Sequence, residues 1–507
     1  MPEPTWSEGY VVDVSYTHGF YGELAPAALA FTALLGTVRP PAFEAPFTYY
    51  ELGCGQGGTT AVLAAANPQG RFFGVDFNPT HIHNAQALVR AAGVDNAAFL
   101  EKSFAEIVGL DLPDAEVVAL HGVWSWVSAE NRAHIVEFIR RRLKPGGLVL
   151  VSYNALPGLA QVAPLQRLLA EQARAGTGEL IARTRRALQF AQRLEQAGAY
   201  YFVASPLAKH RLGQLGRMNP LYVAHEYHNA QWAPFYHADV AQELSQAKLG
   251  YAASAITLDN FSQFVLKPEA AKVVAEAPDR TAAETLKDFA RNCVFRKDLF
   301  TRGAPKAAAA ELEAALDAMR FSLMRPRALC RLALRTTAGE LALQPEAHAP
   351  LLDALAQGPM TFREALQAPA CAALGRERLR QALFALVAAE NVAAAAPAAG
   401  EATRRSRTQR FNAAVLAGPN AEYSVLASPV LGSGVPLTLL DRIFLTSGRT
   451  GDAAIAHARA ALAAAGVKLT QQDRVVEDEA EASRVLEERA QRFFGALLPF
   501  YHLLGVA

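Results

Sequence analysis

The sequence has little net charge and few cysteines. Its formal net charge is only +1 over 507 residues, so no overall electrostatic field draws the protein to nucleic acid or to a membrane surface. Four cysteines lie far apart, at Cys54, Cys293, Cys330 and Cys371. This spacing argues against a disulfide framework and against a zinc site. We therefore expect reduced thiols, no bound metal, and specificity that comes from a pocket or groove.

The sequence also lacks an export signal and a long apolar run. Residues 1–10 carry acids and prolines instead of a basic stretch followed by an apolar one, and no apolar run has the length of a membrane span. We expect a cytoplasmic protein with no membrane partner. The composition, 51% hydrophobic and 19% charged, is that of a globular protein, and the length alone suggests about three domains.

A glycine-rich turn is the most informative feature that the chain does contain. Residues 51–58 read Glu-Leu-Gly-Cys-Gly-Gln-Gly-Gly, after an apolar run at 47–52 and before an alanine-rich run at 59–66. This order predicts a buried parallel strand, a tight turn and a helix. Glycines let the chain turn sharply and let a ligand approach the bare backbone. The glycines expected in this nucleotide-cofactor pocket are Gly53, Gly55 and Gly57.

Two classes of cofactor use such a turn. Three of the glycines satisfy the dinucleotide spacing, so a dehydrogenase has to be considered. Glu51 argues against it, because its carboxylate would repel a pyrophosphate but attracts the ammonium and sulfonium of S-adenosylmethionine. Asp76 ends a second predicted strand at 71–76, at the position that binds the ribose hydroxyls of either cofactor, and Phe77 follows it. The charge of Glu51 therefore favours S-adenosyl-L-methionine.

Strands and helices alternate through the N-terminal third of the chain. Further strands are predicted at 97–100, 116–120 and 148–153, and helices at 80–92 and from Ser128 to Leu143. The pattern predicts an α/β fold, with a Rossmann-like, doubly wound and mostly parallel sheet whose ligand lies at the carboxyl ends of the strands.

The remaining two thirds read as helical and mixed segments. The expected division is 1–156 for the N-terminal arm and cofactor-binding domain, 157–249 for a helical region, 250–335 for a middle region, and 336–507 for a C-terminal domain with helices spaced as in a winged helix. Arginines between 183 and 193 are diluted by glutamates, which favours a solvated helix face or a homodimer contact over a nucleic-acid site. The polar, arginine-rich run at 403–409 is interpreted as a mobile loop or the wing.

Polar and aromatic residues follow the fourth and fifth predicted strands, at 121–127 and 152–158. In this topology both segments border the reactive end of the cofactor. Aromatic faces hold a cation or its alkyl stem, and exclusion of water favours the neutral, nucleophilic form of an amine. The candidate acceptor-site residues are His121, Trp124, Trp126, Tyr153 and Asn154. Because the tryptophans are two positions apart, they share a side only if the segment is extended, and either one can instead belong to the core.

These segments resemble those of a known protein family. The resemblance continues in His225–Asn229, Phe295–Leu299 and Leu426–Gly434, and so covers nearly the whole chain. The chain resembles class I S-adenosylmethionine-dependent methyltransferases of the bacterial protein-lysine type, similar to the rickettsial enzymes that methylate an outer-membrane protein. The resemblance implies a methyltransferase regulatory domain in the middle and a winged-helix-like domain at the end.

The resemblance also carries expectations about single residues. It implies that the segment 15–20 is an arm that folds over the cofactor, with Tyr16 as a lid residue. Such enzymes often carry an acid after the third strand that meets the adenine amino group, and here Lys102 and Ser103 stand there instead. Ser103 can accept that hydrogen bond, though more weakly than a carboxylate.

The chemistry expected is in-line attack of a neutral amine on the sulfonium methyl. A free lysine has a pKa of about 10.4, so its deprotonation needs help. His121 as a base and Tyr153 as a hydrogen-bond acceptor are the candidates, although His121 can equally contact the cofactor through its backbone. The expected partner is a protein substrate, with no nucleic acid. Two alternatives stay open: a small-molecule N- or O-methyltransferase, and a cofactor-binding regulatory protein without turnover.

Overall fold

The computed structural model of the chain describes residues 19–303, 307–336, 339–418, 423–471 and 474–507. Within this part, seven strands form one sheet in the order β3-β2-β1-β4-β5-β7-β6. Their bounds are β1 Phe47–Leu52, β2 Gly70–Asp76, β3 Ala97–Glu101, β4 Ala115–Leu120, β5 Leu143–Asn154, β6 Leu249–Ser254 and β7 Phe295–Arg302. The first five strands are parallel, and β7 runs antiparallel to both β5 and β6. The predicted Rossmann-like, mostly parallel sheet is confirmed.

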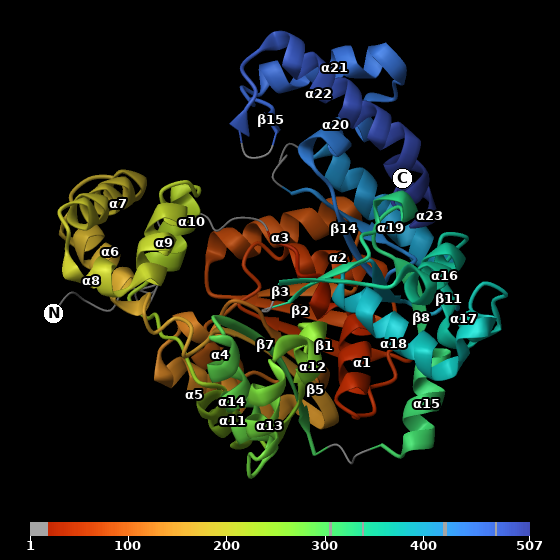
Figure 1. Cartoon of the computed structure of the whole chain (residues 1–507), viewed down its shortest axis with the longest axis horizontal. Coiled ribbons are helices and arrows are strands. Elements are labelled where there is room, and N and C mark those ends of the chain that lie inside the picture. The colour runs from red at the N-terminus through yellow and green to blue at the C-terminus, as the bar shows by residue number, and fades with distance from the viewer. Residues whose placement is uncertain (1–18, 304–306, 337–338, 419–422, 472–473) are drawn as a thin grey trace.

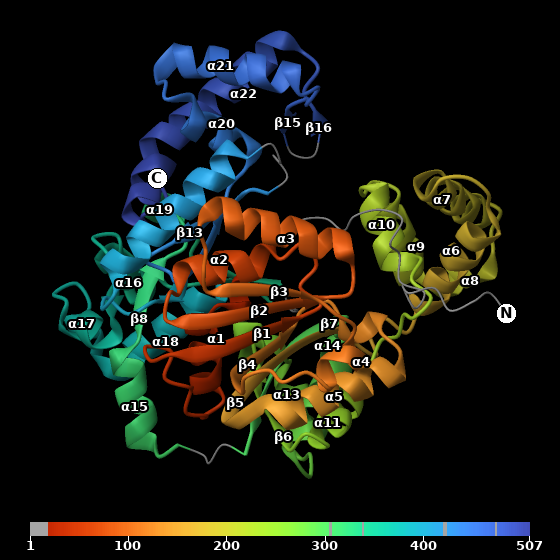
Figure 2. The same cartoon turned by 180° about the vertical axis from the view of Figure 1, so that it is seen from behind.

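Both faces of this sheet are covered, as a doubly wound fold requires (Figure 2). The flanking helices are α1 Pro26–Leu35, α2 Gly58–Ala66, α3 Pro79–Ala92, α4 Phe104–Val108, α5 Ala129–Arg142 and α11 His237–Ser245. Neighbouring residues of a strand point to opposite faces. Accordingly Tyr49 packs into the cluster that contains residues of α1 and α2, whereas Tyr50 packs into the cluster with residues of α5 and α11. The strands are apolar on both faces because both are buried.

Local sequence signals account for the helix ends near the site. The side chain of Asn78 accepts a hydrogen bond from the Thr80 backbone N–H at 2.9 Å and caps α3. Gly93, in the left-handed region with a φ of 62°, closes the same helix. Ser128 caps α5 by accepting from the Asn131 N–H at 3.1 Å. These predicted boundaries agree with the structure to within one or two residues.

A helical lobe follows β5 and stands beside the sheet (Figures 1 and 2). It comprises α6 Ala163–Ala175, α7 Leu180–Gln196, α8 Tyr200–Ala204, α9 Pro206–Leu215 and α10 Pro220–Tyr227. The lobe has its own buried cluster, which includes Leu165, Leu188 and Val223. It therefore packs as a unit that projects from the seven-stranded sheet.

The segment after the lobe returns to the sheet. It contributes α11, β6, β7 and the helices α12 Ser262–Val265, α13 Pro268–Ala275 and α14 Arg280–Arg291. The region predicted as a separate middle unit is thus divided in space. Its strands β6 and β7 extend the first sheet, whereas β8 (Arg320–Leu323) pairs with strands of the C-terminal region.

The C-terminal region combines short sheets with many helices. Its elements are α15 Ala309–Ala318, β8, β9 Ala333–Thr336, β10 Gly339–Ala342, α16 Pro345–Leu355, β11 Met360–Thr361, α17 Phe362–Gln367, α18 Gly375–Ala388, β12 Val392–Ala395, α19 Glu401–Ala417, β13 Val425–Ser428, β14 Ser433–Pro436, α20 Leu439–Ser447, α21 Gly451–Ala464, β15 Thr470–Gln471, β16 Arg474–Val475, α22 Glu479–Arg492 and α23 Leu498–Leu503. None of the helices in the described ranges is long and apolar enough to cross a membrane.

The prediction of a loop or wing at 403–409 is wrong, because these residues lie inside α19. Its buried side chains recur at helical spacing, at Arg404, Thr408, Phe411 and Val415. Arg404 is buried although it is charged, because its guanidinium donates to the backbone carbonyl of Pro429 at 2.7 Å and to that of Ala399 at 2.8 Å. The polar composition concealed a buried helix face.

This C-terminal region packs directly on the helices that follow the glycine turn. Helix α19 lies against α2 and α3 (Figure 2). The side chain of Asn67 donates to the Gly432 carbonyl at 2.8 Å, and the Tyr423 hydroxyl donates to the Gly58 carbonyl at 2.9 Å. A Cβ at Gly58 would lie 2.7 Å from the Tyr423 ring. Both ends of α2 are therefore fixed in part by residues more than 300 positions away.

Replacement of Tyr423 with Phe is expected to lower the free energy of unfolding by about 1 kcal/mol, because the buried hydrogen bond to Gly58 is lost. Urea unfolding followed by circular dichroism measures it. Tyr200→Phe is the matched control, since Tyr200 is 80% exposed. Equal stability of the two variants would contradict a stabilising role for the Tyr423 hydroxyl.

Candidate active site

The three predicted glycines of the turn have different structural reasons to be glycine. All have a positive φ: 72° at Gly53, 53° at Gly55 and 70° at Gly57. A Cβ at Gly53 would lie 2.5 Å from a methyl of Val123, and one at Gly57 would lie 2.5 Å from the Cβ of Ala85. A Cβ at Gly55 would meet no protein atom within 4 Å. Gly53 and Gly57 thus permit close packing, while Gly55 leaves open space beside the turn.

Asp76 holds this turn from the neighbouring strand. One oxygen of its carboxylate accepts a hydrogen bond from the Gly55 backbone N–H at 2.9 Å. The other oxygen accepts from the Asn78 N–H at 2.9 Å and lies 3.3 Å from Nδ1 of His81. Asp76 is 8% exposed and lines the cavity described below. The end of β2 and the glycine turn are therefore joined through one carboxylate.

Glu51 lies at the end of β1 and is 4% exposed. Its carboxylate accepts a hydrogen bond from the Thr60 hydroxyl at the start of α2. Burial raises the pKa of Glu51 to about 7, because the charged form loses its hydration, although the hydrogen bonds from Thr60 act in the opposite direction. A cation placed beside Glu51 would favour the ionised form and would lower this pKa again.

A cavity of about 800 Å³ lies at the carboxyl ends of the strands, between the sheet and the helical lobe. Its size is within the range of small-molecule and cofactor sites. Among its lining residues are nine of the predicted ones: Glu51, Gly53, Gly55, Asp76, Phe77, Ser103, His121, Trp126 and Asn154. Residues predicted from five different strand ends are thus brought together around one space.

Ser103 combines its place at the cavity with a role in helix capping. Its hydroxyl accepts from the Glu106 backbone N–H at 3.3 Å and donates to the Glu106 carboxylate at 3.0 Å. One lone pair of the hydroxyl remains for a ligand donor. Ser103 is therefore able to accept from an adenine amino group, as the sequence predicts, while it caps α4.

Three predicted residues do not line the cavity. Gly57 packs against Ala85 and Phe99. Trp124 is fully buried in the cluster on the α5 side of the sheet, within the short 3-10 turn Trp124–Trp126. Tyr153 is fully buried in the same cluster. The predicted Tyr16 lies outside the described residues.

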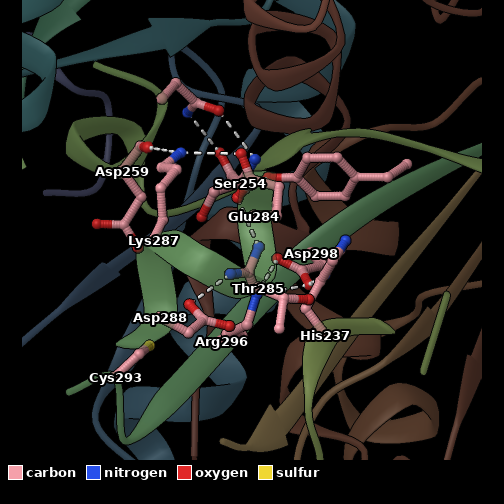
Figure 3. Close-up of polar contacts among 12 residues, drawn as sticks. His237, Ser254, Asp259, Glu284, Thr285, Lys287, Asp288, Cys293, Arg296 and Asp298 are labelled. Atoms are coloured by element: carbon pink, nitrogen blue, oxygen red, sulfur yellow. Dashed lines mark hydrogen bonds and ion pairs between the residues drawn. The ribbon is translucent and has the colours of Figure 1, made fainter. Parts of the chain in front are cut away.

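Tyr153 belongs to a buried polar network centred on Asp298 and Arg296. Figure 3 shows the part of this network around Arg296, Asp288, Asp298 and His237. Its hydroxyl donates to the Asp298 carboxylate at 2.6 Å, and Nδ1 of His237 lies 2.9 Å from the same oxygen. Arg296 donates to Asp298 at 2.8 Å and to Asp288 at 2.6 Å. Burial alone would raise the pKa of Asp298, but Arg296 and His237 hold it well below its usual range. We assign Tyr153 to this network, which joins β5 to β7, rather than to the methyl acceptor.

Two residues near the start of the described chain reach the site without having been predicted. The ring of Tyr21 stacks on that of His121, with centroids 3.5 Å apart. Glu23 forms an ion pair with Lys297, and one of its oxygens lies 3.6 Å from Nδ1 of His121. Burial lowers the pKa of His121 to about 4, against a smaller opposite effect of Glu23. His121 is therefore neutral near pH 7 and is a weak base.

The open space at Gly55 leads to a prediction with a matched control. Gly55→Ala should weaken binding of the expected S-adenosylmethionine at least about tenfold, because the added methyl occupies cavity space. Gly93→Ala is the control: its φ is 62° and its Cβ would also meet no protein atom within 4 Å, but it lies outside the cavity. Both variants bear a similar backbone strain, of about 1–2 kcal/mol. Calorimetry should separate them, and equal affinities would contradict a ligand beside Gly55.

Two protein-family models match the chain, and both describe parts of methyltransferases. The model of a family described as "Methyltransferase domain" matches residues 50–149, and that of a "Predicted methyltransferase regulatory domain" matches residues 219–302. An uncharacterised protein of Synechocystis sp., sll1526, is 36% identical over 99% of this chain and 100% of its own length. An uncharacterised protein of Rickettsia prowazekii, RP789, is 29% identical over 57% of this chain and 51% of its own.

The fold is also similar to that of a solved rickettsial protein. The structure of PKMT2 from Rickettsia typhi in complex with AdoHcy matches 97% of this chain and 99% of its own, with a TM-score of 0.68 and 18% identity. A second structure of the same protein matches 94% of this chain and 97% of its own, with a TM-score of 0.64. At this level of identity the likeness concerns the fold.

The residues around the cavity fit S-adenosylmethionine. Glu51 offers a carboxylate for its cationic end, and Asp76 offers one for its ribose. The Thr59 hydroxyl is buried, lines the cavity and has no hydrogen-bond partner among the described residues, so it is left for a ligand. The space beside Gly55 admits ligand atoms against the backbone.

Proposed function

This chain belongs to the class I S-adenosylmethionine-dependent methyltransferases that carry a methyltransferase regulatory domain, and we propose that its methyl acceptor is a lysine side chain of a protein substrate. Its cofactor is S-adenosylmethionine. The glycine turn alone gives no information about the methyl acceptor.

The observation that carries the proposal is the composition of the cavity beyond the cofactor end. Its lining includes the aromatic residues Tyr21, Trp126, Tyr222 and Phe295 and the carboxylate of Glu226, together with His210 and Arg211 of the lobe. Aromatic faces and a carboxylate suit a primary ammonium on an alkyl stem. The motifs that resemble rickettsial protein-lysine methyltransferases and the fold likeness to PKMT2 support the same acceptor.

When bound, the cofactor supplies an electrophilic methyl group on a sulfonium, which a neutral amine attacks in line. The residues of the chain position the reactants and exclude water, since the transfer needs no covalent enzyme intermediate. Glu51 and Asp76 orient the cofactor from the ends of β1 and β2. Trp126 and Phe295 provide apolar walls that favour the uncharged amine.

Incubation with a methyl-labelled donor and a lysate of the source cells tests the proposal. We expect label in protein bands and, after acid hydrolysis, in methylated lysines. Asp76→Ala is the control for cofactor-dependent labelling. Label in a small-molecule fraction would instead indicate the N- or O-methyltransferase, and no label in either fraction would indicate a binding protein without turnover; both results would contradict the proposal.

A further inference from the structure

The helical lobe forms the end of the cavity that lies opposite the sheet. Helix α9 contributes Leu207, His210, Arg211 and Gln214, and α10 contributes Tyr222 and Glu226. Glu226 is thus a carboxylate on the same cavity as Glu51, but from a segment about 170 residues later in the chain. Two acids therefore face one space from two different parts of the fold.

Glu226 has the acid–base properties of a group that exchanges protons near neutral pH. Burial raises its pKa to about 7, and the positive charge of Arg211 only partly opposes this effect. Arg211 is committed to other partners as well: it donates to the Tyr227 hydroxyl at 2.8 Å and to the Gln214 side chain at 3.3 Å. A base is most effective when its pKa lies near the working pH.

Tyr21 lines the same cavity as Glu226. Its ring stacks on His121 beside the sheet. Burial raises the pKa of its hydroxyl to about 12, and the charges of Glu51, Glu23 and Glu226 add to this effect. Tyr21, Glu51 and Glu226 all line this cavity, so an amine bound in it would have an aromatic wall and two carboxylates around it.

The other candidate bases are less suited to the task. His121 has a pKa of about 4 and lies next to Lys297, whose charge lowers it further. Tyr153 is buried in the network around Asp298, away from the cavity. His210 lines the cavity, but its Nε2 lies 3.0 Å from the amide nitrogen of Gln214, which occupies that ring nitrogen.

We propose that Glu226 of the helical lobe receives the proton of the acceptor ammonium, with Tyr21 and Tyr222 as the walls that hold its alkyl stem. This inference rests on the proposed lysine acceptor and adds the group that activates it. It gives the lobe a direct part in the reaction.

The proposed step balances in protons and electrons. The ammonium gives one proton to the ionised Glu226, which leaves a neutral amine and a carboxylic acid. The lone pair of the amine forms the new N–C bond, the C–S bond breaks, and its electron pair stays on sulfur as a thioether. Glu226 then releases its proton to solvent. Desolvation helps the first transfer, because it removes two opposite charges from a poorly hydrated cavity.

Glu226→Gln is the test, with Glu226→Asp as a shorter acid and Glu171→Gln as the control. Glu171 is an exposed acid of the same lobe, paired with Arg167 at 2.6 Å and absent from the cavity lining. The probes are a lysine-containing peptide from a protein labelled by the wild-type protein, and adenosylhomocysteine for calorimetry. The readouts are kcat and KM against pH, and peptide affinity in the presence of adenosylhomocysteine.

We expect Glu226→Gln to lower kcat about a hundredfold, to abolish the inflection of the wild-type rate near pH 7, and to leave adenosylhomocysteine affinity unchanged. Glu226→Asp should retain the inflection with a reduced rate, and Glu171→Gln should behave as wild type. A wild-type kcat and pH profile in Glu226→Gln would overturn the inference and leave the proposed function intact, as would a rise in KM alone. Absence of lysine labelling by the wild-type protein would overturn both.

Discussion

Asp76→Ala is expected to weaken binding of S-adenosylmethionine at least about a hundredfold. Hydrogen bonds to a charged group are worth about 1.5–3 kcal/mol each, and Asp76 accepts two from backbone N–H groups, at Gly55 and Asn78. The variant would therefore lose both the ribose contact and the bond that positions the glycine turn. Every 1.4 kcal/mol is about a tenfold change in affinity, so two such interactions account for the expected loss.

Isothermal titration calorimetry with adenosylmethionine and adenosylhomocysteine measures this effect. Asp76→Asn should be intermediate, because it keeps an oxygen for one N–H but loses the charge. Asp111→Ala is the matched control, since the Asp111 side chain is fully exposed. Unchanged affinity in Asp76→Ala, with circular dichroism like that of wild type, would remove Asp76 from the site.

The sequence predicted those parts of the site that lie directly at the carboxyl ends of the strands. The glycine turn, Glu51 and Asp76 follow directly from apolar strands whose carboxyl ends meet at one edge of the sheet. Ser103 and Asn154 follow from the same rule at the ends of β3 and β5. For these residues, the position in the sequence relative to a strand end is enough to place them at the cavity.

The different positions of Tyr153 and Asn154 follow from the two-residue period of a strand. Neighbouring residues point to opposite faces, and both were predicted at the acceptor. In the structure Tyr153 packs on the same side as Val149 and Val151, whereas Asn154 lines the cavity. The partners that decide this, Asp298 and His237, lie on β7 and α11 and have no sequence signal near Tyr153.

Tyr21 and Glu226 were missed for a related reason. Neither belongs to a recognisable motif for a cavity residue, and each reaches the site through the packing of a distant segment, the chain before α1 and the helical lobe. The resemblance did single out His225–Asn229, but as a family segment without a role. Long-range packing, which no local pattern encodes, decides which side chain of that segment faces the cavity.

Glu51→Gln is the second change with a large expected effect, a loss of about ten- to a hundredfold in affinity for adenosylmethionine. The variant keeps the shape of the side chain and removes the charge that attracts the cationic end of the cofactor, an interaction of about 1.5–3 kcal/mol. In the cofactor-free protein, ionisation of the buried Glu51 carboxyl is unfavourable. Because the folded-state pKa of about 7 lies above the ordinary value of 4.5, the contribution of Glu51 to stability is present below pH 4.5 and is lost as the pH rises through about 7.

Calorimetric titration of the wild-type protein and Glu51→Gln with adenosylmethionine, between about pH 5.5 and pH 7.5, tests the central role of Glu51 most directly. Bound cofactor should lower the pKa of Glu51 from about 7, so the wild-type affinity should rise with pH, with release of a proton, and level off above about pH 7. The affinity of Glu51→Gln should be weaker and flat over this range. Identical pH profiles in the two proteins, or tighter binding of NAD than of adenosylmethionine to the wild type, would contradict it.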